Sequence, residues 1–360
     1  MYSFKTDDVN DALYHGIMHL LQCGVEETSR NGRVLVAPEP VCTEYTNPRS
    51  RVLYSPTRDA NPFFHVMEAL WILSGSNDVE FTSYFAKNML NYSDDGKTSW
   101  GAYGWRLRSF FGYDQIDAVI EELKTNSESR RCVLGMWNAA DNPALPQWLK
   151  WCRNSSADMI VAINGGKDVP CNTQIYVDAR GGRLNITVTN RSNDIIWGCY
   201  GANAVHFSFL QEYLAMRVGI LAGVYRQFSN NFHCYLDKFS REKLKQIAQE
   251  SDTLGKLPDT GPALEPGFDD DLALFMPWAR ALIRHESNVI PSHGSAEPGA
   301  LELEIPTLKT RFMADVAVPM FLAWYYRKQH DEFSMNVCLD GIDAPDWQRA
   351  CQEWVDRRKK

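Results

Sequence analysis

The spacing of apolar residues predicts an amphipathic opening helix over residues 8–23 and a second helix over residues 63–73. The second run is almost continuously apolar, which is typical of a helix that is covered on every side. Asn61 and Pro62 stand where a helix begins, and Gly75 stands just beyond the end of the run. We therefore expect a central, buried helix early in the chain.

The rest of the chain contains patterns of both helices and strands. Further helices are expected over residues 116–124, 203–218, 272–285, 311–328 and 346–358, the last opened by Pro345. Two strand patterns, over residues 175–177 and 184–188, flank Gly181-Gly182 and predict a β-hairpin. Shorter or irregular patterns give extended segments over 34–53, a buried strand over 132–137, an irregular stretch over 138–167 with Trp148 and Trp151 on a short helix, and loops over most of 253–305. This mixture indicates an α+β fold with a mainly antiparallel or mixed sheet.

Composition and charge narrow the class of protein. The 360 residues are 44% hydrophobic and 23% charged, as in soluble globular proteins, and the formal net charge of −8 argues against a broad nucleic-acid-binding surface. The nine cysteines are scattered, odd in number and without a CxxC pair, which favours a reducing cytoplasm over disulfides or a metal site. Residues 1–10 are polar and lack a signal-like apolar region, and the apolar run at 316–325 is too short to cross a membrane. We expect a cytoplasmic protein with neither a nucleic-acid nor a membrane partner.

The strongest candidate for chemistry is Cys171, which follows Pro170 and leads into the first strand of the hairpin. A thiolate can add to C6 of a pyrimidine ring and make C5 nucleophilic. Arg191 and Ser192 follow twenty residues later; a guanidinium and a hydroxyl suit a phosphate, and the positive charge would favour the thiolate. The alternative for Cys171 is a buried structural cysteine.

Glu68 is a carboxylate inside the apolar run. Such a group is costly to bury unless it is paired or functional. Burial would also raise its pKa toward the range useful for proton transfer. The sequence leaves two interpretations open, a catalytic acid–base group and a buried ion pair.

Five stretches in a fixed order resemble the thymidylate synthase family, which includes the pyrimidine-nucleotide hydroxymethylases. They are residues 67–71 with Gly75, residues 101–104 with Arg106, residues 129–131, Pro170-Cys171, and residues 191–203 followed by 233–235. The resemblance covers about residues 30–239. It implies an α/β sandwich around a six-stranded mixed sheet and a homodimer. It also implies a catalytic core over residues 1–240, leaving residues 241–360 as a mostly helical C-terminal extension packed on that core.

The resemblance further implies a role for each matching residue. The catalytic group comprises Cys171, Glu68, Tyr103 and Arg191. The residues assigned to phosphate binding are Arg30, Arg130, Arg131, Arg191 and Ser192. Arg33 and Arg58 are alternatives to Arg30. Arg130 and Arg131 are expected to reach the partner's phosphate site. The base is assigned to Asn203, the sugar to His233 and Tyr235, and the one-carbon donor 5,10-methylenetetrahydrofolate to Asp194, Gly198 and Tyr92. No metal is implied.

Asn203 bears on which base is bound. Its amide can accept from N3–H and donate to O4 of uracil, whereas cytosine presents the reverse pattern, and family members specific for cytosine carry an aspartate there. An amide can flip, however, and this chain has one extra residue between Gly198 and Asn203. We expect dUMP as the substrate, with dCMP or CMP as alternatives.

Several departures from the family bear on the product. Asn172 stands where synthases carry histidine, and Asn190 where they carry glutamine. Residues 89–96 lack the tryptophans that pack over the reacting carbon, with Tyr92 the nearest aromatic residue, and a long extension replaces the short apolar tail of the synthases. A wetter site lets water add to the transferred carbon. We therefore expect a 5-hydroxymethylase, with thymidylate synthase and a non-catalytic nucleotide- or RNA-binding relative as alternatives.

Overall fold

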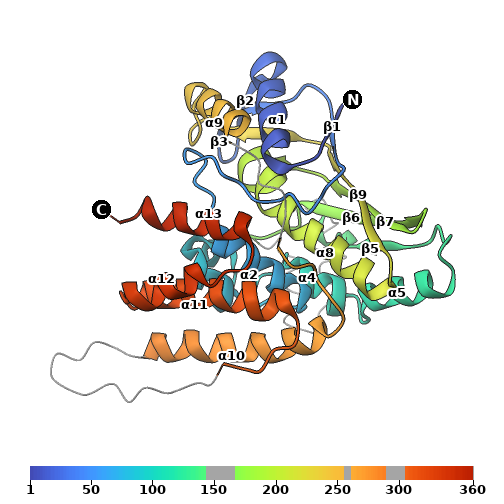
Figure 1. Cartoon of the computed structure of the whole chain (residues 1–360). Coiled ribbons are helices and arrows are strands. Elements are labelled where there is room, and N and C mark those ends of the chain that lie inside the picture. The colour runs from blue at the N-terminus through green and yellow to red at the C-terminus, as the bar shows by residue number, and fades with distance from the viewer. Residues whose placement is uncertain (143–166, 255–260, 289–304, 360) are drawn as a thin grey trace.

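The computed structural model describes residues 1–142, 167–254, 261–288 and 305–359 (Figure 1). Its main sheet has six strands. In spatial order they are β1 (Tyr2–Thr6), β4 (Val41–Tyr45), β9 (Leu221–Ser229), β7 (Arg183–Asn190), β6 (Asn172–Arg180) and β5 (Val133–Gly135). The β1–β4 and β7–β9 pairs are parallel and the other pairs are antiparallel. The expected six-stranded mixed sheet is thus confirmed.

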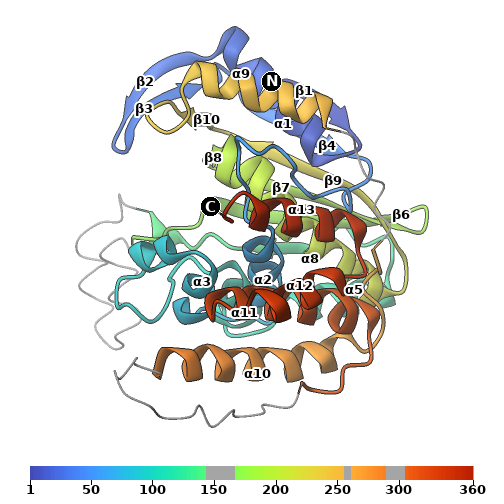
Figure 2. The same cartoon turned by 60° about the vertical axis from the view of Figure 1, so that its left-hand side comes forward.

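A second sheet of four strands lies at one edge of the molecule. Its order is β2 (Val25–Ser29), β3 (Gly32–Val36), β10 (Phe232–Tyr235) and β8 (Asn193–Asp194). Figure 2 shows this sheet beside α1 (Val9–Cys23) and α9 (Arg241–Thr253). In its register His233 lies directly opposite Asp194, so a predicted sugar contact and a predicted folate contact are neighbours.

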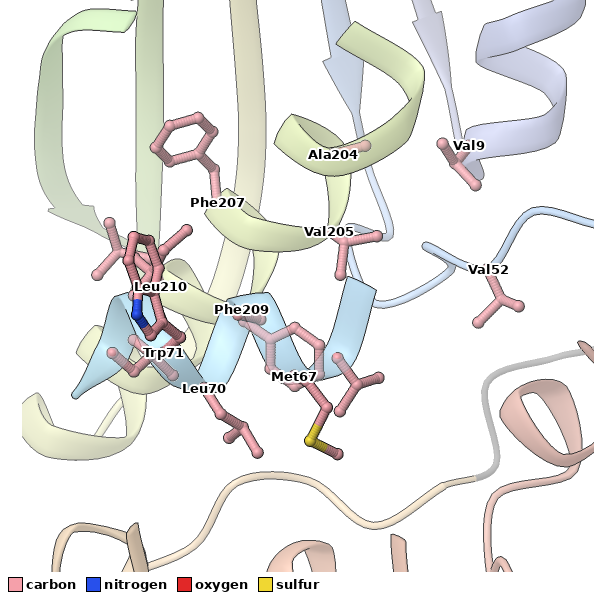
Figure 3. Packing of buried hydrophobic residues seen from close by; sticks show 14 of the residues in the cluster. Val9, Val52, Met67, Leu70, Trp71, Ala204, Val205, Phe207, Phe209 and Leu210 are labelled. Atoms are coloured by element: carbon pink, nitrogen blue, oxygen red, sulfur yellow. The ribbon is translucent and has the colours of Figure 1, made fainter. Parts of the chain in front are cut away.

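Two helices form the centre of the core beneath the main sheet. They are α2 (Pro62–Leu73) and α8 (Asn203–Val218), and both are buried along most of their length. Asn61 caps α2 by accepting from the Phe64 backbone N–H, as the Asn-Pro start predicts. The apolar side chains of the two helices join one continuous cluster (Figure 3). Because both helices are fixed by packing, polar side chains on them are held in defined positions.

The remaining elements surround this centre. They are α3 (Val79–Phe85), η1 (Lys87–Tyr92), α4 (Tyr103–Trp105), η2 (Arg106–Phe110), α5 (Gln115–Thr125), η3 (Ala139–Asp141), η4 (Ile195–Ala202), α10 (Phe268–Asn288), η5 (Met313–Ala317), α11 (Val318–Lys328), α12 (Glu332–Asp340) and α13 (Pro345–Asp356). No helix in the described ranges is both long and apolar enough to cross a bilayer.

The C-terminal helices gather on one side of the molecule, against α2 (Figure 1). Phe63 of α2 packs against Trp324 of α11 and Trp354 of α13, with ring centroids 5.5 and 5.7 Å apart. Arg358 adds a bidentate pair with Asp59, just before α2. The boundary at residue 240 stays a prediction, because α9, which follows it, packs closely on α1 in the core.

Most of the expected elements are confirmed within one to four residues. The hairpin has Gly181 and Gly182 at φ of 58° and 72°, the left-handed conformation of a tight two-residue turn. The sequence analysis missed β1, which it described only as a polar start. It also made no prediction for the strands β2, β9 and β10 or for the helices α3, α9 and α12. Its short helix with Trp148 and Trp151 lies outside the described residues.

Candidate active site

Cys171 directly precedes β6 and Arg191 directly follows β7, so the hairpin brings the two residues together. The Arg191 backbone N–H donates to the Cys171 carbonyl at 2.9 Å. The guanidinium donates to the carbonyls of Pro170 (2.9 Å) and Val169 (3.0 Å), and Nη2 lies 3.9 Å from the Cys171 Sγ. The peptide before the thiol therefore holds the cation beside the sulfur.

Opposing influences act on the Cys171 thiol. Burial raises its pKa above the ordinary value and Asp168 adds to the rise, while Arg191 and Arg30 lower it, with a net upward shift. The expectation that Arg191 favours the thiolate is right in sign, but burial outweighs this effect. Burial therefore favours the protonated thiol over the thiolate.

Tyr103 and Asp168 lie next to this thiol. Burial raises the pKa of Tyr103 well above its usual value, with Cys171, Asp168 and Glu68 adding to the rise through their charges. Asp168 accepts hydrogen bonds from the Ser99 hydroxyl and the Gly101 backbone, yet burial still raises its pKa. Tyr103 is therefore within electrostatic reach of two other predicted residues, Cys171 and Glu68.

Glu68 on α2 faces His206 on α8. The His206 Nε2 lies 3.0 Å from the Glu68 Oε2, and the two side chains are only 3% and 11% exposed. The ring is not aligned for a hydrogen bond, so both atoms lack an aligned partner among the described residues. The nearby His65 has a pKa lowered well below its usual value by burial, with Arg58 and His206 contributing. The buried Glu68 carboxylate therefore has a buried imidazole beside it. This arrangement agrees with both interpretations of Glu68, the catalytic acid–base group and the buried ion pair.

Asn203 begins α8 and is 6% exposed. Its Nδ2 donates to the Asn193 Oδ1 at 3.1 Å, and Gly198 lies next to both amides, where an added Cβ would stand 2.8 Å from that Oδ1. Asn172, which follows Cys171, donates its amide N–H to Asn190. The two asparagines that depart from the family pattern therefore bond to each other.

His233, Tyr235 and Asp194 lie together across β8 and β10. The His233 and Tyr235 rings meet edge to face with centroids 5.1 Å apart. The Asp194 Oδ1 caps η4 by accepting from the backbone N–H groups of Ile196 and Trp197, while its buried Oδ2 has no partner among the described residues. Burial raises the Asp194 pKa, with these N–H groups and His233 opposing the rise.

The other predicted residues lie at the periphery. Arg30, on the exposed β2–β3 turn, reaches the thiol through its charge, and Ser192 is half-buried beside Arg191. Of its competitors, Arg33 pairs with Asp237 at the surface, and Arg58 is buried and donates to the Ile196 carbonyl.

Three predicted residues are not drawn into the cluster around Cys171. Arg130 and Arg131 are exposed just before β5, where Arg130 lines a surface cavity of about 940 Å³ together with residues of the β6–β7 hairpin. Tyr92 is 48% exposed at the end of η1. Each role proposed for these three residues stays a prediction. Across the described ranges no cluster of three or more His, Cys, Asp or Glu side chains has the arrangement of a metal site.

Sequence reasoning missed Asp168 and His206. Asp168 precedes Cys171 by three residues in an irregular stretch, where no hydrophobic periodicity predicts its position. His206 stands in a helix that the apolar spacing predicts, and a buried Glu68 requires a polar neighbour. That requirement was the available signal, but only the α2–α8 contact identifies the neighbour.

Comparisons with known proteins show the family to which the chain belongs. The family model described as thymidylate synthase matches residues 14–260. A deoxyuridylate hydroxymethyltransferase of Pseudomonas phage M6 is 42% identical over 100% of this chain and 95% of its own length. Enzymes of the same name from Bacillus phage SP01 and Delftia phage PhiW-14 are 32% and 31% identical, over 74% and 72% of this chain and 69% and 68% of their own lengths. The resemblance noted in the sequence is confirmed, and the chain belongs to the thymidylate synthase family of one-carbon transferases.

Proposed function

We propose that the protein transfers a one-carbon unit from 5,10-methylenetetrahydrofolate to C5 of dUMP and releases 5-hydroxymethyl-dUMP. The observation that carries the proposal is the arrangement of Cys171, held beside Arg191, with Tyr103 and Glu68 around it. Relatives along the full chain bear the name deoxyuridylate hydroxymethyltransferase, which supports the same reaction.

The nucleotide would lie along the hairpin. Its phosphate would meet Arg191, Ser192 and Arg30, its sugar hydroxyl His233 and Tyr235, and its base Asn203. When the phosphate binds Arg191, water leaves the guanidinium, and the phosphate–arginine pair beside the thiol is desolvated. We therefore expect the active site to be complete only when the substrate is bound.

We further propose a homodimer in which Arg130 and Arg131 reach the partner's phosphate site. Both side chains are exposed at the main sheet's edge, as such a role requires. The open face of the sheet also carries Tyr176, 46% exposed, which a partner could cover. The free state of all cysteines in the described residues fits a cytoplasmic location.

The chain has groups that suit the folate. The Asp194 Oδ2 is a buried acceptor without a partner among the described residues, as the N–H groups of a pterin ring require. Trp197, 46% exposed, lies beside Tyr235 with ring centroids 6.2 Å apart and offers a flat surface for an aromatic ring. Gly198 follows Trp197 directly, and its lack of a side chain lets the Asn193 amide approach the backbone. When bound, methylenetetrahydrofolate supplies a carbon at the oxidation level of formaldehyde.

The chemistry then follows from the side chains. The Cys171 thiolate bonds to C6, and the C5–C6 electron pair makes C5 the nucleophile toward the one-carbon unit. Once the carbon is transferred, removal of the C5 proton is accompanied by cleavage of the bond between that carbon and the folate nitrogen. Tetrahydrofolate leaves with the electron pair of that bond, and the nucleotide carries a methylene group at C5. Water adds its oxygen to that carbon and gives up a proton. The electrons return through the ring, C5=C6 re-forms, and the Cys171 sulfur leaves as thiolate. We assign the transfer of these protons to Glu68, with His206 beside it.

Access of water supports hydroxymethylation over methylation. The η1 segment, where the family's covering tryptophans would stand, has no buried residue, and Leu90 and Tyr92 are 46% and 48% exposed. A hydride donor would have to compete with water at this carbon.

Mass spectrometry of the products tests the proposal. The protein is incubated with methylenetetrahydrofolate and each of dUMP, dCMP, UMP and CMP. A gain of one CH2O unit on dUMP is the expected result. A gain of one CH2 unit with dihydrofolate formed would replace the proposal with thymidylate synthase, preferred turnover of dCMP or CMP would correct the base, and no product from any nucleotide would contradict enzymatic function.

A matched pair of variants tests the nucleophile. Cys171→Ser should abolish turnover while dUMP still binds in calorimetry, because the serine hydroxyl keeps the volume but cannot form a thiolate. Cys23→Ser, at the exposed end of α1, should leave turnover unchanged. Turnover by the first variant would remove Cys171 from the mechanism.

A further inference from the structure

A row of three buried carboxamides leads to the residue proposed to bind the base. Gln227 on β9 is fully buried, and Asn193 on β8 and Asn203 at the start of α8 are 2% and 6% exposed. The Asn193 Nδ2 donates to the Gln227 Oε1 at 3.2 Å, and the Asn203 Nδ2 donates to the Asn193 Oδ1 at 3.1 Å. The three side chains come from separate elements and form one hydrogen-bonded row.

The far end of the row is anchored to the backbone. The Gln227 Nε2 donates to the Cys199 carbonyl at 2.8 Å, and a carbonyl oxygen can only accept. Gln227 must therefore turn its Oε1 toward Asn193. Asn193 in turn must offer its Nδ2 to Gln227 and its Oδ1 to Asn203. A second acceptor, the Ser229 Oγ at 2.9 Å, takes the other hydrogen of the Asn193 Nδ2.

The row thereby orients the amide of Asn203. Its Nδ2 must face Asn193, which leaves its Oδ1 and one remaining N–H hydrogen for a ligand. This pattern accepts from the N3–H of uracil and donates to O4. Cytosine needs the flipped amide, which would place the Asn203 Oδ1 against the Asn193 Oδ1. Flipping all three amides would instead set the Gln227 Oε1 against the Cys199 carbonyl. Either arrangement leaves two buried acceptors facing each other.

We propose that Gln227 and Asn193 are positioning residues that make the site selective for uracil over cytosine, by preventing the Asn203 amide from flipping. The proposal rests on the proposed function, in which Asn203 reads the base. The amide of an isolated asparagine can flip and so can bind either base. The hydrogen-bonded row removes this ambiguity, because it leaves the Asn203 amide one orientation of lowest energy.

Three variants test the row. Asn193→Ala releases Asn203 and should reduce the preference for dUMP over dCMP about tenfold or more, the effect of one unsatisfied buried group. Asn193→Asp places an acceptor at the same point toward Asn203 and should keep most of the preference. Ser229→Ala is the matched control: it removes one hydrogen-bond partner of Asn193 but leaves the bonds to Gln227 and Asn203 in place, and should change the preference less than about twofold.

The measurement is the dissociation constant of each nucleotide in the Cys171→Ser background, so it does not depend on turnover or on the product. Circular dichroism shows whether each variant folds; if Asn193→Ala does not, Asn193→Gln, which displaces the amide, takes its place. Unchanged selectivity in the folded variant would overturn the role of the row alone. Equal loss in Asn193→Asp and Asn193→Ala would also overturn it, since a merely structural role predicts that result. Tighter dCMP than dUMP binding by the parent protein would instead overturn the proposed base.

Discussion

Replacing Arg191 by methionine should raise the pKa of the Cys171 thiol by about one unit. At the observed 3.9 Å between Nη2 and Sγ, two unit charges attract by about 4 kcal/mol at an effective dielectric constant of 20 and by about 1 kcal/mol in water. Arg191 is exposed, so solvent screening brings the value toward the lower figure, about 1–1.5 kcal/mol. That free energy corresponds to about one pKa unit.

The assay follows alkylation of Cys171 by iodoacetamide as a function of pH, with the labelled peptide quantified by mass spectrometry. Only the thiolate reacts, so the midpoint of the rate profile reports the thiol pKa. Losing the nearby cation disfavours the thiolate, and the midpoint should move to higher pH. The midpoint is a better measure than the rate at one pH, because a thiolate of higher pKa is intrinsically more nucleophilic.

A lysine variant separates charge from structure. Arg191→Lys keeps a cation but loses the fork that donates to Val169 and Pro170. If charge controls the thiol, Arg191→Lys should keep the midpoint within a few tenths of a unit of the parent. A midpoint that does not move in the methionine variant would refute the reasoning, and equal shifts in both variants would assign the effect to the lost backbone contacts.

Three further predictions concern groups around the site. Burial raises the pKa of Asp168, so the folded state binds the Asp168 proton more tightly than the unfolded state does. The free energy of unfolding therefore falls as the pH rises from about 4 through the raised pKa. Asp168→Asn should flatten this fall in urea titrations at several pH values. Arg106→Met should lower the free energy of unfolding by about 3–5 kcal/mol in urea, because it leaves Asp141, whose side chain is fully buried 2.6 Å away, without its cation. Gly104→Ala should destabilise by about 1–3 kcal/mol in the same assay, since its Cβ would stand 2.2 Å from the Ile72 carbonyl oxygen. A parent-like midpoint in either of the last two variants, or a parent-like pH dependence of stability in Asp168→Asn, would contradict the corresponding argument.

Elements with strong local signals were predictable from the sequence. The start of α2 follows from the Asn61 cap, and the β6–β7 turn follows from Gly181-Gly182, whose left-handed backbone few other residues tolerate. Strand β1 was not predictable from its own residues, because it is an edge strand of mixed polarity whose one partner among the described strands is β4. Its existence depends on a partner some forty residues away.

The residues of the candidate site fall into the same two groups, those that the sequence predicts and those that only the packing of the fold identifies. Cys171 and Arg191 could be named because a recognisable motif surrounds each of them. The link between Gln227 and Asn193 could not, since it depends on β9 and β8 meeting through their side chains, and no periodicity encodes that meeting. His206 was hidden for the same reason, as only the packing of α8 on α2 brings it to Glu68. Motifs identify the groups that react, whereas packing determines which neighbours orient them.

The contact between α2 and the C-terminal helices has a consequence for synthesis of the chain on the ribosome. Phe63, on the helix that carries Glu68, is covered by Trp324 and Trp354. About 270 residues separate the end of α2 from α13, so at about 5–20 residues per second the helix waits on the order of 15–50 s for its last cover. During that interval an apolar surface beside the future active site stays open to water. We expect nascent chains to need a chaperone at this stage and to become competent for nucleotide binding only after α13 has left the ribosome.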